Sequence, residues 1–284
     1  MLVPEEIRQC VVFLCYRIGE QVRLAGTGFF VSVPTGFGER IYVYLITARH
    51  VIEGISDRST DGKVLVRINT VAGGVELIES DLDAWSFHPD EEKADVAVIS
   101  AAPSRSRFEY RTIPRAMFAT QEAVNEHGIG LGDELFFPGL FVNHYGQNRN
   151  LPIMRLGNIA GMPEEPVITS WRGQMEAYLV EGRSIGGLSG SPVFVHLVLG
   201  RGGNINLSSP RFFLLGLMHG HYDASLTDAD EMIADDAQFD QVNMGIAIVA
   251  PAQKIAEMLD QKSLVDERAR NDELLRRQNQ GTPD

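Results

Sequence analysis

Ser189 stands in SIGGLSGSPVF (residues 184–194), a segment with the small residues that could hold a reactive hydroxyl in a sharp turn. A serine hydroxyl is a poor nucleophile at neutral pH unless a neighbouring base, usually a histidine, takes its proton. That histidine is usually oriented by a buried carboxylate. Ser189 is therefore a candidate nucleophile, and an ordinary glycine-rich turn is the alternative.

His50 is the histidine whose context fits such a base. It lies in YLITARHVIEG, just after an apolar segment that is typical of a strand. A side chain at the end of a strand can be both fixed and accessible. The chain has seven histidines, so a plain surface histidine remains the alternative at this position.

Asp95 is the acidic residue that directly precedes an apolar run, VAVI, at the end of HPDEEKAD. A carboxylate in that place is expected to be partly buried and to need a partner. On the local pattern alone, a strand-capping aspartate is favoured over a catalytic one. The order His50, Asp95, Ser189 nevertheless matches the order of chymotrypsin-type triads and differs from those of α/β-hydrolases and subtilisins.

The elements that would position these three groups are short strands rich in Val, Ile, Tyr and Phe. We expect them in two halves, separated by a less regular stretch at about 102–130 with a helical turn. The expected strands are 10–18, 26–34, 40–48, 63–71 and 95–100, then 133–141, 154–162, 176–182, 191–199, 211–219 and 244–250. Pro251 opens a short amphipathic helix, and the charged stretch 262–284 predicts a solvated helix, with a partner-binding tail as the alternative.

Composition excludes several classes of protein. The formal net charge of -13 argues against nucleic-acid binding, and no apolar run reaches the about 18 residues of a membrane span. The N-terminal stretch is acidic where a signal peptide would be basic, which predicts a cytoplasmic protein. Cys10 and Cys15 suit neither a zinc site nor a disulfide framework, so we expect two buried thiols on opposite faces of one strand. No cofactor and no metal are predicted.

Six segments occur in the order and at roughly the spacing of the trypsin-like serine peptidase family, which the chain resembles over about residues 8–260. They are GTGFFV, LITARHVIEG, HPDEEKADVAVI, GGLSGSPVF, LLGLMHG and MGIAIVAPAQKIAEML. The nearest types are bacterial: glutamyl endopeptidases and high-temperature-requirement proteases. The resemblance implies an all-β fold of two six-stranded antiparallel β-barrels at right angles, with a short C-terminal helix. The expected divisions are 1–120 for the first barrel, 121–250 for the second, and 251–284 for the helix and charged tail.

The resemblance also assigns roles to residues. It implies that His50 is the general base, Asp95 its orienting carboxylate and Ser189 the nucleophile, in a cleft between the barrels. The main-chain N–H groups of Gly187 and Ser189 would form the oxyanion hole. Leu188 departs from the family, which usually has Asp or Asn there, and Ser191 replaces the second glycine of the commoner motif.

The same resemblance implies which residues would recognise the substrate beside the scissile bond. Arg183 stands where the floor of the primary specificity pocket is expected, and His219 and Gly220 lie on the strand that would pair with the substrate backbone. A cationic floor with a nearby histidine favours an acidic residue before the scissile bond. The acidic stretch 222–240 offers the alternative that Arg183 only pairs with one of its carboxylates.

The expected function is that of a serine endopeptidase, which hydrolyses a protein or peptide substrate through an acyl-enzyme. Because Leu188 removes the acidic group used in trypsin-type zymogen activation, regulation by a protein partner is a further expectation. The alternative is a non-catalytic trypsin-like module that binds proteins.

Overall fold

Strands dominate the structure, a computed structural model that describes residues 3–36, 40–90, 94–169, 173–182, 186–197, 212–224 and 242–280. The first-half strands are β1 (Val11–Ile18), β2 (Gln21–Pro34), β3 (Ile41–Thr47), β4 (Lys63–Asn69), β5 (Val75–Asp81), β6 (Ser86–Phe87), β7 (Ala97–Ser100) and β8 (Ile113–Pro114). The second-half strands are β9 (Glu134–Gly139), β10 (Ile153–Gly161), β11 (Val167–Thr169), β12 (Gly173–Met175), β13 (Tyr178–Glu181), β14 (Pro192–His196), β15 (Phe212–Ala224) and β16 (Val242–Pro251).

The first-half strands form one sheet of eight strands. Its order is β5-β4-β1-β2-β3-β7-β6, and β8 pairs in parallel with β2. The other pairs are antiparallel. In the described residues β5 and β6 are therefore the ends of the sheet, which has two strands more than the expected barrel.

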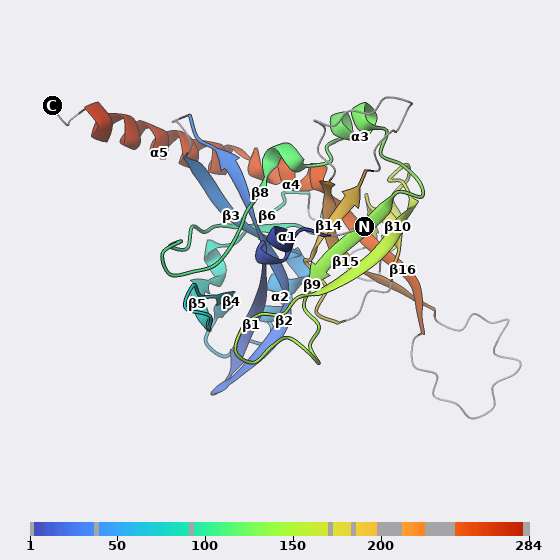
Figure 1. The fold of residues 1–284 in the computed structure, drawn as a ribbon, viewed down its shortest axis with the longest axis horizontal. Helices are drawn as coiled ribbons and strands as arrows, with labels where there is room; N and C mark the ends of the chain where they lie inside the picture. Colours follow the sequence, from blue (N-terminus) through green and yellow to red (C-terminus); the bar gives the residue numbers. More distant parts are fainter. Residues whose placement is uncertain are drawn as a thin grey trace, which may run out of the picture.

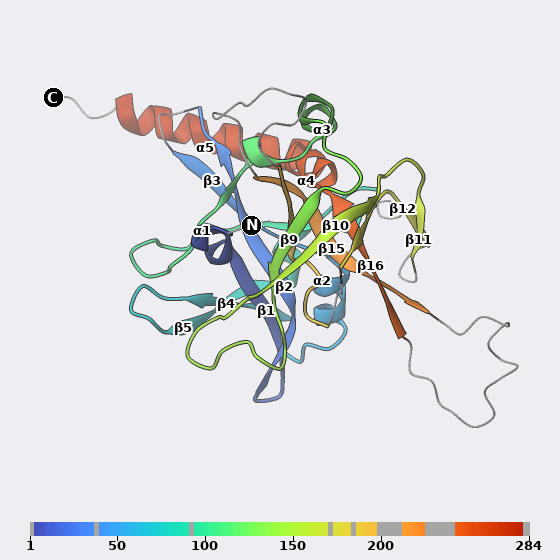
Figure 2. The same cartoon turned by 45° about the vertical axis from the view of Figure 1, so that its right-hand side comes forward.

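Six second-half strands close into a barrel in the order β10-β13-β16-β15-β14-β9. Every pair in this barrel is antiparallel. The short strands β11 and β12 form a separate hairpin, which Figure 2 shows standing off the barrel. The expected all-β architecture is confirmed, and the closed six-stranded barrel is found in the second half. The expected domain boundaries at 120 and 250 stay predictions.

Five α-helices accompany the strands in the described residues. They are α1 (Glu5–Gln9), α2 (Arg49–Ser56), α3 (Gln121–His127), α4 (Ala252–Leu259) and α5 (Lys262–Gln280). The amphipathic helix expected after Pro251 is α4, whose Ile255, Met258 and Leu259 are fully buried. None of the described helices combines the length and the apolar character that a membrane crossing requires.

Helix α5 passes along the ends of first-half strands, beside β3 (Figure 1). Arg268 donates to the Tyr44 hydroxyl at 3.0 Å, and the Tyr42 hydroxyl donates to Asp272 at 2.7 Å. Both tyrosines belong to β3. The charged C-terminal stretch is thus a helix with specific contacts to the sheet.

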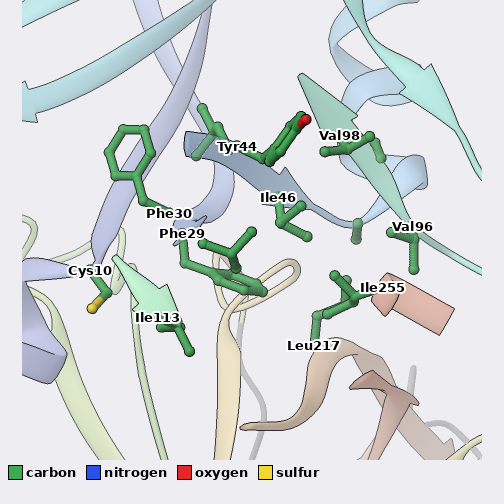
Figure 3. Close-up of a cluster of buried hydrophobic side chains, with 14 of the residues drawn as sticks. Cys10, Phe29, Phe30, Tyr44, Ile46, Val96, Val98, Ile113, Leu217 and Ile255 are labelled. Atoms are coloured by element: carbon green, nitrogen blue, oxygen red, sulfur yellow. The ribbon is translucent and has the colours of Figure 1, made fainter. Parts of the chain in front are cut away.

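One apolar core joins the two halves. Phe29, Phe30 and Ile46 of the first sheet lie in the same buried cluster as Leu217 of the barrel and Ile255 of α4 (Figure 3). Each of these five side chains has no measurable exposure. The packing between the halves is therefore apolar and continuous, which gives the polar groups between them a rigid frame.

Both cysteines are buried free thiols, as expected. The expected placement on one strand is wrong for Cys10, because α1 occupies residues 5–9 and β1 begins only at Val11. Cys15 lies within β1, the strand between β4 and β2. Burial raises the pKa of each thiol to about 12.

Candidate active site

His50 lies in the first turn of α2, directly after β3. The strand ends at Thr47, Ala48 is extended, and the helix begins at Arg49. The buried face of α2, which includes Val51 and Ile52, packs into the core and fixes the helix. His50 itself retains 24% exposure of its side chain, so it is both held and accessible.

Asp95 binds His50 twice. Its Oδ1 accepts a hydrogen bond from the main-chain N–H of His50 at 2.9 Å, and its Oδ2 accepts one from Nδ1 of the same residue at 2.7 Å. The first of these bonds also satisfies a free N–H at the start of α2, where Ala48 has no side chain that could cap the helix. The local sequence favoured a strand-capping role, but Asp95 instead caps helix α2 and orients an imidazole at the same time.

His219, on β15, adds a second imidazole to the same carboxylate. Its Nδ1 lies 2.5 Å from Oδ2 of Asp95, and its ring meets that of His50 edge to face, with the centroids 5.2 Å apart. Asp95 is completely buried and His219 is 7% exposed. The sequence placed His219 on a substrate-pairing strand, and its bond to Asp95 was missed. No local pattern signals it, because the two residues lie 124 positions apart.

The contacts of Asp95 decide its charge. Burial alone would raise the pKa of this carboxyl, but the two imidazoles hold it well below its usual range. Burial likewise would lower the pKa of His50, but the Asp95 carboxylate raises it above the ordinary 6.5. Asp95 is thus an anion at neutral pH, and it strengthens His50 as a base.

His50, Asp95 and His219 are also residue types that bind metal ions, and their ligand atoms all lie within 4.8 Å of one another. Two ligands of a tetrahedral zinc ion at its usual bond length lie about 3.3 Å apart. The imidazole nitrogens are only 2.7 and 2.5 Å from the Asp95 oxygen. These are hydrogen-bond lengths, so the arrangement is a carboxylate shared by two N–H donors.

Ser189 lies in the loop before β14, beside this cluster. Its hydroxyl donates to the main-chain carbonyl of His219 at 3.2 Å. Its own carbonyl accepts the N–H of Thr27 at 2.9 Å, and the next residue, Gly190, donates to Met218 at 2.8 Å. The loop is therefore held from both sides, by β2 of the first sheet and by β15 of the barrel.

The main-chain N–H groups of Gly187 and Ser189 have no protein acceptor among the residues that the structure describes. Gly187 has a φ of +99°, in the region that side chains disfavour. An added Cβ at this glycine would also lie 3.0 Å from Leu140. Glycine is therefore required here both by the backbone conformation and by the space.

The chain is similar in structure to solved protease domains. The chain matches no protein-family model and no curated protein sequence at a significant level. It is similar to the MamO protease domain from Magnetospirillum magneticum (apo form), with a TM-score of 0.53 and 14% identity over 90% of this chain and 98% of that one. The chain has the chymotrypsin-like protease fold. At this identity the likeness shows the fold alone, so any activity rests on the residues of the site.

Two further solved structures are more distant. Deg5 matches with a TM-score of 0.46 and 15% identity, over 89% of this chain and 88% of that one. The Rv3671c protease from M. tuberculosis, in its active form, matches with a TM-score of 0.45 and 15% identity, over 89% and 80%.

The chymotrypsin-like fold accommodates both departures in the serine loop through one glycine, Gly139 of β9. Leu188 is fully buried in the barrel core, and Ser191 is fully buried with a hydroxyl that has no hydrogen-bond partner among the described residues. A Cβ on Gly139 would collide with the Ser191 hydroxyl and would lie 2.6 Å from the Leu188 side chain. The missing side chain of Gly139 therefore makes room for both.

The expected specificity residues are only partly described. Arg183 lies outside the described residues, as do residues 225–241 of the acidic stretch. Gly220 of β15 is paired with Ile248 of β16, and a Cβ added to it would meet no atom of the described residues within 4 Å. Among the residues that the structure describes, nothing therefore packs against the main chain at Gly220, next to the imidazole of His219.

Proposed function

We propose that this chain is a serine endopeptidase in which Ser189 is the nucleophile, His50 the general base and Asp95 its orienting carboxylate. The observation that carries the proposal is the pair of bonds from Asp95 to His50, with the Ser189 hydroxyl beside the same cluster. A buried anion on Nδ1 leaves Nε2 of the imidazole as the proton acceptor. This is the chemistry that a serine nucleophile requires.

The reaction then follows from the positions of the groups. The Ser189 hydroxyl turns from the His219 carbonyl to Nε2 of His50, gives up its proton and attacks the peptide carbonyl. Asp95 stabilises the imidazolium that forms, and the imidazolium then gives its proton to the leaving amine. Water, activated by His50 in the same way, hydrolyses the acyl-enzyme and restores Ser189.

The oxyanion of the tetrahedral intermediate is bound by the N–H groups of Gly187 and Ser189. Support comes from the absence of a protein acceptor for either group in the described part of the chain. Loss of one such donor typically lowers turnover by about 10²–10³-fold. The orientation of these two N–H groups therefore matters to the rate of the reaction.

A fluorophosphonate probe tests the proposal directly. We expect it to label the wild-type protein at Ser189, as located by peptide mass spectrometry, and Ser189→Ala to abolish labelling. Ser191→Ala is the matched control, because its buried hydroxyl lies two residues further on and takes no part in the reaction; it should label as the wild type does.

Absence of labelling in the wild type would favour the non-catalytic protein-binding module. If labelling appears only when a partner protein is added, the expected regulation is supported as well. The preference for an acidic residue before the cut stays a prediction, and a peptide-library cleavage profile tests it. The cytoplasmic location also stays a prediction.

A further inference from the structure

Thr27 is a completely buried residue of β2 that touches the serine loop with its side chain. Its hydroxyl donates to the main-chain carbonyl of Gly187 at 2.7 Å. The same oxygen accepts the N–H of Leu140 at 3.0 Å. One hydroxyl of the first sheet therefore satisfies two polar groups of the barrel, one of them on the glycine of the proposed oxyanion hole.

The main chain of Thr27 adds two bonds to this junction. Its N–H donates to the carbonyl of Ser189 at 2.9 Å. Its carbonyl accepts the hydroxyl of Thr47, three residues before His50, at 2.7 Å. Thr27 is thus bonded to both residues whose N–H groups are proposed to bind the oxyanion, and to the end of the strand that leads to the base.

The bond to Gly187 restricts a backbone that has no side chain to restrict it. The carbonyl of Gly187 belongs to the peptide group between residues 187 and 188, and holding it fixes the plane of that group. The direction of the Gly187 N–H then depends mainly on rotation within the glycine itself. Leu140, which Thr27 also holds, lies against that glycine and limits this rotation.

We propose that Thr27 is a positioning residue of the reaction, which aims the Gly187 N–H at the oxyanion through its hydroxyl. This inference rests on the proposed serine peptidase function. In this role Thr27 contacts neither His50 nor the substrate. It belongs to the first half of the chain and acts on Gly187, which belongs to the second half. A side chain of the same shape that lacks the hydroxyl would keep the packing and lose the two hydrogen bonds.

The test compares Thr27→Val, Thr27→Ser and Thr70→Val with the wild type, on one peptide substrate over a range of pH. We expect Thr27→Val to lower kcat by about 10–100-fold, less than the about 10²–10³-fold found when an oxyanion donor is removed, because the Gly187 N–H is still present but less well aimed. KM and the acid limb of the pH profile should stay unchanged, because the His50–Asp95 pair is untouched. Thr27→Ser keeps a hydroxyl and should recover most of the rate.

Thr70→Val is the matched control for the loss of a threonine hydroxyl. Thr70 is also buried, at 7% exposure, and its hydroxyl accepts the N–H of Gly74 at 3.0 Å within the first half. This variant should be destabilised without a change in kcat. A kcat of Thr27→Val equal to that of the wild type, or a failure of Thr27→Ser to recover it, would overturn the role of Thr27.

The two proposals fail in different ways. If the wild type neither hydrolyses peptides nor reacts with the fluorophosphonate, the serine peptidase function fails, and the positioning role fails with it. If the wild type reacts and Thr27→Val reacts equally fast, only the positioning role is wrong.

Discussion

Asp95 is the residue on which most of the site's polar contacts converge. It has no exposure to solvent, and its two oxygens accept one main-chain N–H and two imidazoles. A buried carboxylate is tolerated only when its charge is matched by such donors. The same contacts that make its burial acceptable also fix the ring of His50.

The pH profile of the reaction should report the contact between His50 and Asp95. A base must be neutral to accept a proton, and the pKa of His50 is raised above 6.5. We therefore expect kcat/KM to rise with pH through a midpoint above 6.5. Asp95→Asn removes the anion, so it should lower that midpoint and lower kcat by about 10⁴-fold through the wrong imidazole tautomer.

Glu134→Gln is the control for this substitution. Glu134 also pairs with a histidine, His196, with its carboxylate 3.0 Å from Nδ1, but it lies at the start of β9. Its variant should leave the midpoint and kcat unchanged. A wild-type midpoint at or below 6.5 would contradict the raised pKa of His50.

The raised pKa of His50 makes the stability of the fold depend on pH in the opposite direction to the activity. A histidine whose pKa is higher in the folded state stabilises that state while it is protonated. Its contribution is complete below pH 6.5 and is lost as the pH rises through the folded-state value. Activity and this part of the stability therefore change in opposite directions over the same pH range.

At the scale of elements, the serine loop fits against β9 only because Gly139 leaves space. The expected departures from the family, Leu188 and Ser191, are both buried against this one position. Leu188 contributes to the barrel core where an acidic residue would have needed a charged partner. The loop is thus fixed by apolar packing and by the bonds from β2 and β15.

Gly139→Ala should destabilise the protein by about 1–3 kcal/mol, the usual cost of overpacking a filled core. The double variant Gly139→Ala/Ser191→Gly should regain much of this loss, because it removes the closest collision. The free energy of unfolding, measured in urea for the single and double variants, gives their coupling.

Gly130→Ala is the matched control, since an added Cβ there would meet no atom of the described residues closer than 4.0 Å. Its free energy of unfolding should equal that of the wild type. If Gly139→Ala and the double variant lose the same free energy of unfolding, the assignment of the collision to Ser191 is wrong.

The sequence predicted the strands that carry apolar runs and missed those that depend on tertiary contacts. Strand β5, VELIESD, is half exposed and charged, so its composition resembles that of a loop. Strands β6 and β8 have two residues each and exist only through pairing with β7 and β2. Helix α2 was missed because no capping side chain precedes it, and its cap comes from Asp95, 45 residues further on.

At the scale of the whole molecule, α5 ties the end of the chain to the first sheet. Arg268 donates to the Tyr44 hydroxyl and, at 2.8 Å, to the carbonyl of Leu259, and its guanidinium lies 5.8 Å from the centre of the Tyr44 ring. Together with the core shared by both halves, this contact favours unfolding of the two sheets as one unit.

Arg268→Ala should therefore lower the free energy of unfolding by about 1–3 kcal/mol, because it leaves the Tyr44 hydroxyl of β3 and the Leu259 carbonyl of α4 without this donor. Arg277→Ala is the control on the same helix. Arg277 is 71% exposed and pairs only with Glu273 of α5 in the described structure, so its loss should have little effect. Thermal unfolding of the two variants checks the difference, and equal stabilities would show that α5 contributes nothing through Arg268.

The site was predictable to the extent that chain order and local apolar context reveal it. These features pointed to His50, Asp95 and Ser189, of which His50 and Asp95 are in direct contact. They could not reveal the contact of His219 with Asp95 or that of Thr27 with Gly187. In each case the partners come from different halves of the chain, and only the packing of the two halves brings them together.

The burial of Cys10 and Cys15 should protect the native chain from thiol reagents. The only two sulfhydryl groups are 4% and 0% exposed, and each has a pKa of about 12. Cys15 sits in the interior of the first sheet, so its rate of alkylation measures how often that sheet opens. Conversely, a single cysteine introduced on the surface would carry a fluorophore or spin label alone, with no native residue to remove first.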